Sequence, residues 1–184
     1  MDFLSALWLP IVLSAIFVWI TSAIIWMAMP HHKSDFHKLP DEEAARDTLG
    51  KQNLSPGFYV VPFAMGPDAQ KPENQKKFEE GPNLYITAVP KGLPAMGKAI
   101  GQSVIFYLIV AVFVAYVLSH SLSADASYLA VFRIAGTIAF MAHSFALIPQ
   151  SIWFGKPWGS TFKDMADALI YGLLTGGTFG WLWS

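Results

Sequence analysis

The sequence of 184 residues contains no cysteine, which excludes disulfide bonds, cysteine-ligated iron–sulfur clusters and thiolate nucleophiles. Charge is also scarce, because Lys, Arg, Asp and Glu make up only 14% of the chain, against ~25% in an ordinary soluble domain. The formal net charge of -1 provides no excess of positive charge for DNA or RNA. No nucleic-acid partner is therefore predicted.

Short catalytic signatures are missing as well. The sequence has no GxSxG nucleophile elbow, no GxxxxGK[ST] phosphate loop and no GxGxxG dinucleotide motif. We therefore predict no catalytic residue and no cofactor apart from the metal discussed below, and the sequence favours a non-enzymatic role.

Long apolar stretches are what the chain does have, with 54% hydrophobic residues and a mean hydropathy of +0.42. A membrane-spanning helix needs ~20 apolar residues. Four stretches reach that length: residues 3–29, 99–118, 127–148 and 164–183. The predicted fold is an all-α membrane protein with four transmembrane helices in contact with the lipid bilayer. The first stretch is too long for a cleaved signal peptide, so we interpret it as a retained anchor.

The positions of Lys and Arg predict the orientation. Residues 30–98 contain nine of the twelve, whereas the turn at 119–126 contains none. The positive-inside rule places residues 30–98 in the cytoplasm and both termini outside. The predicted organisation is transmembrane helix 1 at 1–29, a cytoplasmic segment at 30–98 and transmembrane helices 2–4 at 99–184.

The cytoplasmic segment has the pattern of a small α+β structure. Residues 40–50 predict a short helix with acids in its first turn and Gly50 as a left-handed C-terminal residue. The β-prone runs at 57–63 and 83–90 predict two strands that pair as a hairpin. The polar, proline-containing stretch between them predicts a loop.

The stretch PHHKSDFH begins at residue 30 and concentrates potential metal ligands in a few positions. Imidazole and carboxylate groups suit divalent ions such as Zn²⁺, Ni²⁺ or Mn²⁺. The candidate metal ligands are His31, His32, Asp35 and His37. Two other interpretations stay open, namely a linker that contacts lipid headgroups and a linker held by polar contacts against the helices or a partner.

Glycines at four-residue intervals predict close helix packing. Gly172, Gly176 and Gly180 share one face of the last apolar stretch, and Gly97 and Gly101 repeat the spacing at the start of the second. Small residues let helix backbones approach closely in lipid. Such a face packs either against the protein's own helices or against another integral membrane subunit or a second copy.

Ionisable residues within the apolar stretches are candidates for function, because charge inside a bilayer is costly. They are Arg133, His143, Asp164 and Asp167. An Asp167–His143 pair is predicted from their similar depth. A small transporter or membrane enzyme would use these groups, whereas a structural interpretation has Arg133 snorkelling to the interface.

The stretch MPHHKSDFHKLPDEEA, followed by PGFYVVPF and YITAVPKG, resembles a group of small, uncharacterised bacterial inner-membrane proteins. The resemblance implies a bacterial membrane protein with four spans and carries no activity. The leading functional prediction is a non-catalytic accessory or scaffold subunit of a bacterial inner-membrane complex. The alternatives are a metal-binding membrane protein and the transporter or enzyme above.

Overall fold

The computed structural model describes residues 2–183, which form two compact units. The helical unit comprises residues 2–36 together with 95–183, and the insert unit is His37–Pro94. Residues 30–36 and 95–98, which the sequence placed with the polar segment, thus belong to the helical unit. This assignment matters because it attaches most of the PHHKSDFH stretch to the helices.

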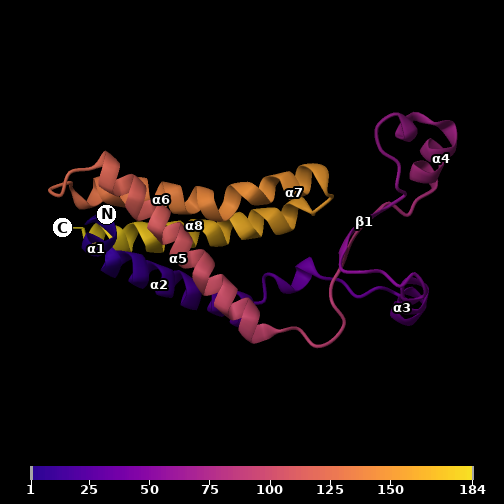
Figure 1. Ribbon diagram of the computed structural model, residues 1–184, viewed down its shortest axis with the longest axis horizontal. Helices are drawn as coiled ribbons and strands as arrows, with labels where there is room; N and C mark the ends of the chain where they lie inside the picture. The colour runs from indigo at the N-terminus through magenta and orange to yellow at the C-terminus, as the bar shows by residue number, and fades with distance from the viewer. Residues whose placement is uncertain (1, 184) are drawn as a thin grey trace. The chain divides into compact units, whose positions relative to one another are not determined.

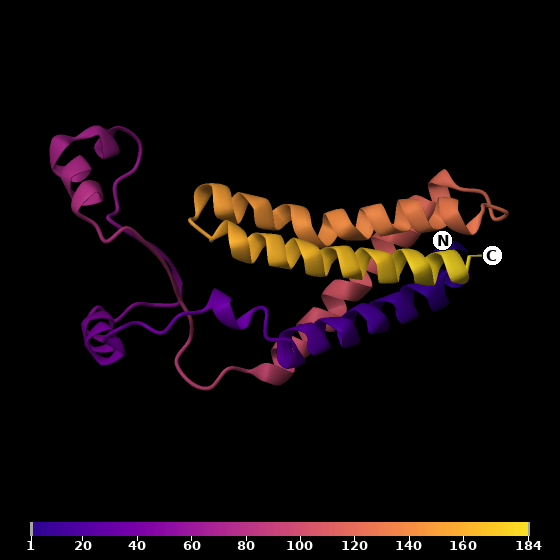
Figure 2. The ribbon, with the colours of Figure 1, turned by 180° about the vertical axis from the view of Figure 1, so that it is seen from behind.

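Helices form nearly all of the helical unit. In chain order they are α1 (Asp2–Ala6), α2 (Trp8–Ala28), α5 (Met96–Ser121), α6 (Tyr128–Ser144), α7 (Ile148–Trp153) and α8 (Trp158–Trp181). Two short 3₁₀ turns, η1 (Lys33–Asp35) and η3 (Phe145–Leu147), lie between them. Figures 1 and 2 both show α6 and α8 side by side, with α5 running obliquely to them.

Three helices in the described chain are long and apolar enough to cross a membrane: Trp8–Ala28, Met96–Ser121 and the combined stretch Tyr128–Trp153. Many of their outward side chains are apolar, among them Ile20 and Phe113, which suits contact with lipid. The fourth predicted stretch is also helical, as α8. It is not among the three, since its first turns carry Lys163, Asp164 and Asp167 and its second half is rich in glycine.

The hydrophobic core lies where α2, α5, α6 and α8 meet. Its fully buried side chains include Val114 and Leu118 of α5, Val131 and Ala135 of α6, and Phe179 of α8. Alanine and valine dominate this core, and their small side chains let the helices approach closely. This core gives the helical unit a rigid frame on which polar side chains near the helix ends can be positioned.

Glycines bring α6 and α8 into backbone contact. A Cβ atom on Gly176 would lie 2.7 Å from the carbonyl oxygen of Phe132, and one on Gly172 would lie 2.8 Å from that of Gly136. At Gly180 the Tyr128 ring would be 2.8 Å away. The sequence left open whether this glycine face packs against the protein's own helices or against another subunit. In the structure it packs against α6 of the same chain.

The second glycine pair behaves differently. A Cβ atom on Gly97 or Gly101 would meet no atom within 4 Å. These two residues at the start of α5 therefore make no close helix contact within the described chain.

The insert unit contains α3 (Glu42–Lys51), β1 (Gly57–Val61), the 3₁₀ turn η2 (Gly66–Gln70), α4 (Pro72–Glu80) and β2 (Leu84–Ala88). The strands pair antiparallel, with Phe58 opposite Thr87 and Val60 opposite Tyr85. This confirms the predicted short helix and strand pair.

Two local predictions for the insert unit are wrong. The predicted loop between the strands contains α4, which begins at Pro72, a residue whose fixed φ suits the first helical position. Gly50 lies inside α3 instead of ending it, and the left-handed residue is Asn53, with φ of 48°. Asn tolerates this conformation because its short side chain can form local hydrogen bonds.

Candidate functional site

The PHHKSD segment turns sharply as it leaves α2. The residue before a proline is restricted to extended conformations, and Met29, which precedes Pro30, has φ −85° and ψ 139°. Helix α2 accordingly ends at Ala28. The carbonyl oxygen of Pro30 then accepts a hydrogen bond from the Lys33 amide at 2.9 Å, which starts the η1 turn.

The η1 turn brings His32 and Asp35 together. In a 3₁₀ turn the side chains at positions i and i+3 lie one above the other. The distance from Nδ1 of His32 to Oδ2 of Asp35 is 2.7 Å. The sequence spacing HxxD thus becomes a direct hydrogen bond.

One face of α8 receives this segment. Ser160, Lys163, Asp164 and Asp167 are spaced at i, i+3, i+4 and i+7, which aligns them along a helix. The ammonium group of Lys163 donates to the His31 carbonyl oxygen at 2.6 Å and to Asp35 at 2.8 Å. The Ser160 hydroxyl donates to the same Asp35 carboxylate at 3.0 Å. The juxtamembrane segment is therefore fastened to α8.

Asp167 is the centre of the cluster. Nε2 of His32 lies 2.7 Å from Oδ2 of Asp167, and Nε2 of His31 lies 3.2 Å from Oδ1. The side chains of His32 and Asp167 are 4% and 7% exposed, so water screens this contact poorly. The His32 ring also stacks on Trp26, with centroids 4.0 Å apart and planes 3° from parallel.

The electrostatics of the cluster follow from these contacts. Burial lowers the pKa of His32, but the hydrogen bonds to Asp167 and Asp35 outweigh it, so this pKa is raised above its ordinary value. The hydrogen bond from Lys163, followed by that from His32, holds the pKa of the Asp35 carboxyl well below its usual range. Both groups are charged more readily here than in water.

A cavity of about 310 Å³ lies beside the cluster, between α2, α5, α6 and α8. Its lining residues include Trp26, Tyr107, His143, Asp167 and Tyr171. Lys156 and Asp164 also line it and form an ion pair with each other. The cavity therefore combines aromatic walls with the charged groups at one end of α8.

His143 does not pair with Asp167 in the described chain, so that prediction is wrong. Its ring packs instead against Phe106, Tyr107 and Tyr171, with centroid distances of 5.4 to 5.7 Å. Asp167 is drawn toward the two histidines that precede η1. The two residues share only the cavity wall, as their similar depth in the sequence suggested.

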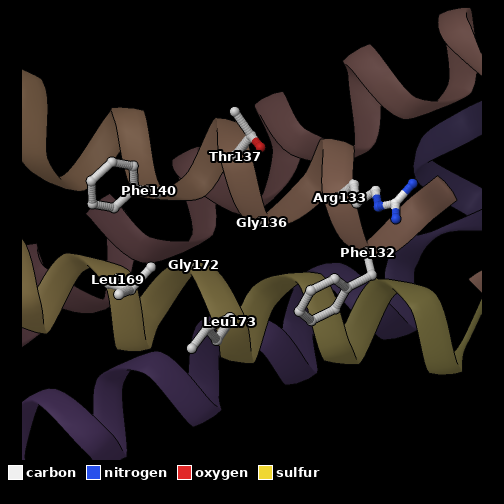
Figure 3. A pocket seen from close by; sticks show the side chains of 8 residues that line it. All are labelled: Phe132, Arg133, Gly136, Thr137, Phe140, Leu169, Gly172 and Leu173. Carbon is white, nitrogen blue, oxygen red and sulfur yellow. The ribbon is translucent and has the colours of Figure 1, made fainter. Parts of the chain in front are cut away.

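Arg133 lies in a different place from the other intramembrane polar residues. It lines an apolar groove of about 260 Å³ between α6 and α8. Figure 3 shows Arg133 beside Phe132 at one end of this groove, with Phe140 and Leu169 at the other. Its side chain is exposed and has no ion pair among residues 2–183.

The structure thus reorganises the candidate metal ligands. It brings His31 and His32 together, places Asp35 against His32 and adds Asp167 from α8, 135 residues farther along the chain. His37 is exposed and belongs to the insert unit. Sequence reasoning missed Lys163, Ser160 and Trp26, although the i, i+3, i+7 spacing of Ser160, Lys163 and Asp167 was a usable signal.

Comparison with known proteins gives no relative for this chain: no family model, curated protein or solved structure matches it. The functional argument therefore depends on the residues and their geometry.

Proposed function

We propose that this chain is a non-catalytic accessory subunit of a membrane protein complex, and that its insert unit docks on a partner subunit. One observation carries the proposal. No residue of the insert unit, all of which is described, is buried, although Phe58 is 88% exposed and Leu93 is 97% exposed. A folded unit without a core needs another surface to cover its apolar side chains.

The two-stranded sheet offers a docking surface. Successive side chains of a strand point to opposite faces, so Phe58 and Val60 share a face with Tyr85 and Thr87 of the paired strand. All four are exposed. An isolated two-stranded sheet is marginally stable in water, and each strand of this sheet has one edge without a strand partner. Partner binding by this face or by strand addition would stabilise it.

The charge of the insert unit favours an apolar interaction over an electrostatic one. Its seven Lys and Arg residues and eight Asp and Glu residues nearly cancel. A neutral segment gains little from an anionic membrane surface, which attracts polybasic sequences. We therefore propose a protein partner over a lipid surface.

We further propose that α8 is a fourth membrane crossing, with both termini on one side and the insert unit on the cytoplasmic side of a bacterial inner membrane. The 24 residues of α8 extend ~36 Å at ~1.5 Å per residue, enough for a ~30 Å hydrocarbon core. Asp167, the tenth residue of α8, bonds the segment after α2, and Trp183 beyond the end of α8 bonds Ser123 of the turn between α5 and α6. The part of α8 from Asp167 onward thus runs alongside its neighbours, and the polar first turns extend past the end of α2.

A transporter or enzyme that uses the four intramembrane polar residues as one site is less well supported. Arg133 lines the α6–α8 groove, whereas His143, Asp164 and Asp167 line the other cavity. A conducting path or a reaction centre would need them to act together.

The test is extraction of the full-length chain from its own membrane in a mild detergent, followed by native mass spectrometry. We expect a mass well above 20.3 kDa, with partner chains in fixed ratio. The double variant Phe58→Asp plus Val60→Asp should release the chain from the assembly. Lys51→Asp, an exposed charge change on α3 of the same unit, is the matched control and should leave the assembly intact.

A wild-type chain that is extracted alone as a monomer would contradict the proposal. So would a complex that survives the double variant unchanged, because the exposed sheet face would then not be the docking surface.

A further inference from the structure

The cluster around Asp167 of α8 brings together side chains of types that bind metal ions. Its ligand atoms come from two segments: the imidazoles of His31 and His32 after α2, and the Asp167 carboxylate on α8. One ligand atom from each residue lies within 4.8 Å of the others. Neighbouring ligands of a single ion must come this close, and a helix-anchored acid together with a fastened turn keeps them there.

Asp35 completes the pattern expected around a metal-bound histidine. A ligating imidazole commonly donates its other N–H to a carboxylate, which fixes the tautomer and orients the ring. His32 does this: its Nδ1 faces Asp35 at 2.7 Å, which leaves Nε2 directed at Asp167. Lys163 and Ser160 hold the Asp35 carboxylate in turn.

The charges of the cluster also leave room for a cation. Lys163 pairs with Asp35, and Lys156 pairs with Asp164. Asp167 has no Lys or Arg partner within residues 2–183, and both of its oxygens face imidazole nitrogens. With Nδ1–H of His32 donated to Asp35, a neutral Nε2 would present a lone pair to a carboxylate oxygen 2.7 Å away. Either a proton on Nε2 or a bound cation between these two atoms would remove the repulsion.

We propose that His31, His32 and Asp167 bind a divalent first-row transition metal ion of the Zn²⁺ class, with Asp35 orienting His32. Two imidazoles and one carboxylate form a borderline ligand set that suits Zn²⁺ and Co²⁺ better than Ca²⁺ or Mg²⁺. Three protein ligands leave a coordination position for water or another small ligand. Asp167 also lines the aromatic cavity, through which such a ligand can approach.

The first experiment titrates the full-length protein, in detergent and without an affinity tag, with Co²⁺ after treatment with a chelator. Visible absorption reports the coordination of Co²⁺, and competition by Zn²⁺ reports its affinity. We expect one ion per chain, displaced by Zn²⁺. X-ray absorption at the zinc edge of the wild-type protein should show two imidazole ligands, and this readout needs no variant.

The variants separate the ligands from their neighbours. His32→Gln and Asp167→Asn should each abolish the Co²⁺ spectrum. Asp35→Asn should keep the spectrum and weaken Zn²⁺ binding ~10–100-fold, as the loss of a ligand's supporting carboxylate does. His37→Gln and His120→Gln are matched controls, exposed histidines outside the cluster, and both should bind like wild type. Far-UV circular dichroism verifies that each variant is folded.

Weak binding of several ions, or binding that survives both His32→Gln and Asp167→Asn, would overturn the proposal. A zinc-edge spectrum without imidazole ligands would overturn it independently of any variant. Loss of binding in His37→Gln would also contradict it, because the site would then include the insert unit.

Discussion

The helical unit and the insert unit are stabilised in different ways within one chain. Val114, Leu118, Val131 and Phe179 of the helical unit are fully buried, whereas the insert unit exposes Phe58 and Leu93. Burial of apolar side chains is the main favourable term in folding. In lipid this driving force does not act between helices, and close packing and polar contacts hold the helices together instead. The helical unit thus has a buried core of its own, whereas the insert unit has none, which is why we propose that it docks on a partner.

The largest effect is expected where the helical unit is most tightly packed. Gly176→Leu places a side chain where a Cβ atom alone would lie 2.7 Å from the Phe132 carbonyl oxygen. Helices α6 and α8 must separate, and we expect a loss of about 3 kcal/mol or more, at the upper end of overpacking costs. The midpoint of unfolding in detergent measures it.

The matched control is Gly101→Leu, a helical glycine at which an added Cβ atom would meet no other atom within 4 Å. We expect a change within about 0.5 kcal/mol there, as for ordinary surface substitutions. An equal loss of stability in Gly176→Leu and Gly101→Leu would contradict the inference that α6 and α8 are in tight contact at Gly176.

The second effect concerns polar contacts in the two units. Lys163→Met removes the donor that joins α8 to Asp35 and to the His31 carbonyl oxygen. Charge-assisted hydrogen bonds contribute ~1.5–3 kcal/mol each at best, and the Lys163 side chain is 31% exposed, so we expect a total loss of about 1–2 kcal/mol. Hydrogen exchange should rise at residues 33–35.

Lys76→Met in the insert unit is the control for this comparison. Lys76 forms an ion pair with Glu80, but the two side chains are 73% and 65% exposed. Surface pairs of this kind contribute little. A destabilisation equal to that of Lys163→Met would show that the two units do not differ in the way proposed.

Local sequence patterns predicted the elements whose causes are local. The apolar runs marked α2, α5 and α6, and the β-prone runs marked β1 and β2, because burial and backbone preference act over a few residues. The same reasoning missed α4, whose charged residues and Pro72 were interpreted as a loop. Pro at the first helical turn and Gly81 after the last are a helix signature.

The candidate site was only half predictable. His31 and His32 stood out by composition, and Asp35 by its spacing, but their partner Asp167 lies on another helix. Asp167 was assigned to His143 because depth in the membrane can be read from the sequence, whereas the rotation and contacts of helices cannot. The η1 turn, which aims His32 at α8, depends on those tertiary contacts.

A smaller effect tests the insert unit directly. We expect backbone amides of β1 and β2 in the purified chain to exchange far faster than those of α5 and α8, because few contacts oppose local opening. In the intact assembly the strand amides should become protected. Slow exchange in the isolated chain would show that the insert unit is stable without a partner and would remove the contrast between the units.

The smallest effect tests what decides how strongly a substitution destabilises the protein. Either the exposure of the side chain decides it, or the unit to which the residue belongs. Asp125 belongs to the helical unit, in the turn between α5 and α6, but is as exposed as the insert residues. The hydrogen bond from the Ser123 hydroxyl lowers the pKa of its carboxyl. A lowered folded-state pKa gives stability that is present above the unfolded pKa of ~3.9 and lost as the pH falls. The Asp125→Asn variant should therefore unfold at a slightly lower temperature than wild type at pH 7, and the difference should shrink as the pH falls below the unfolded pKa toward the lowered folded-state pKa. Because this carboxyl group is exposed, the loss of stability in Asp125→Asn should be far smaller than that in Lys163→Met. If Asp125→Asn destabilised the protein as much as Lys163→Met, the turn would be coupled to the core of the helical unit. The two units would then differ in how their parts are connected and not in how deeply their side chains are buried.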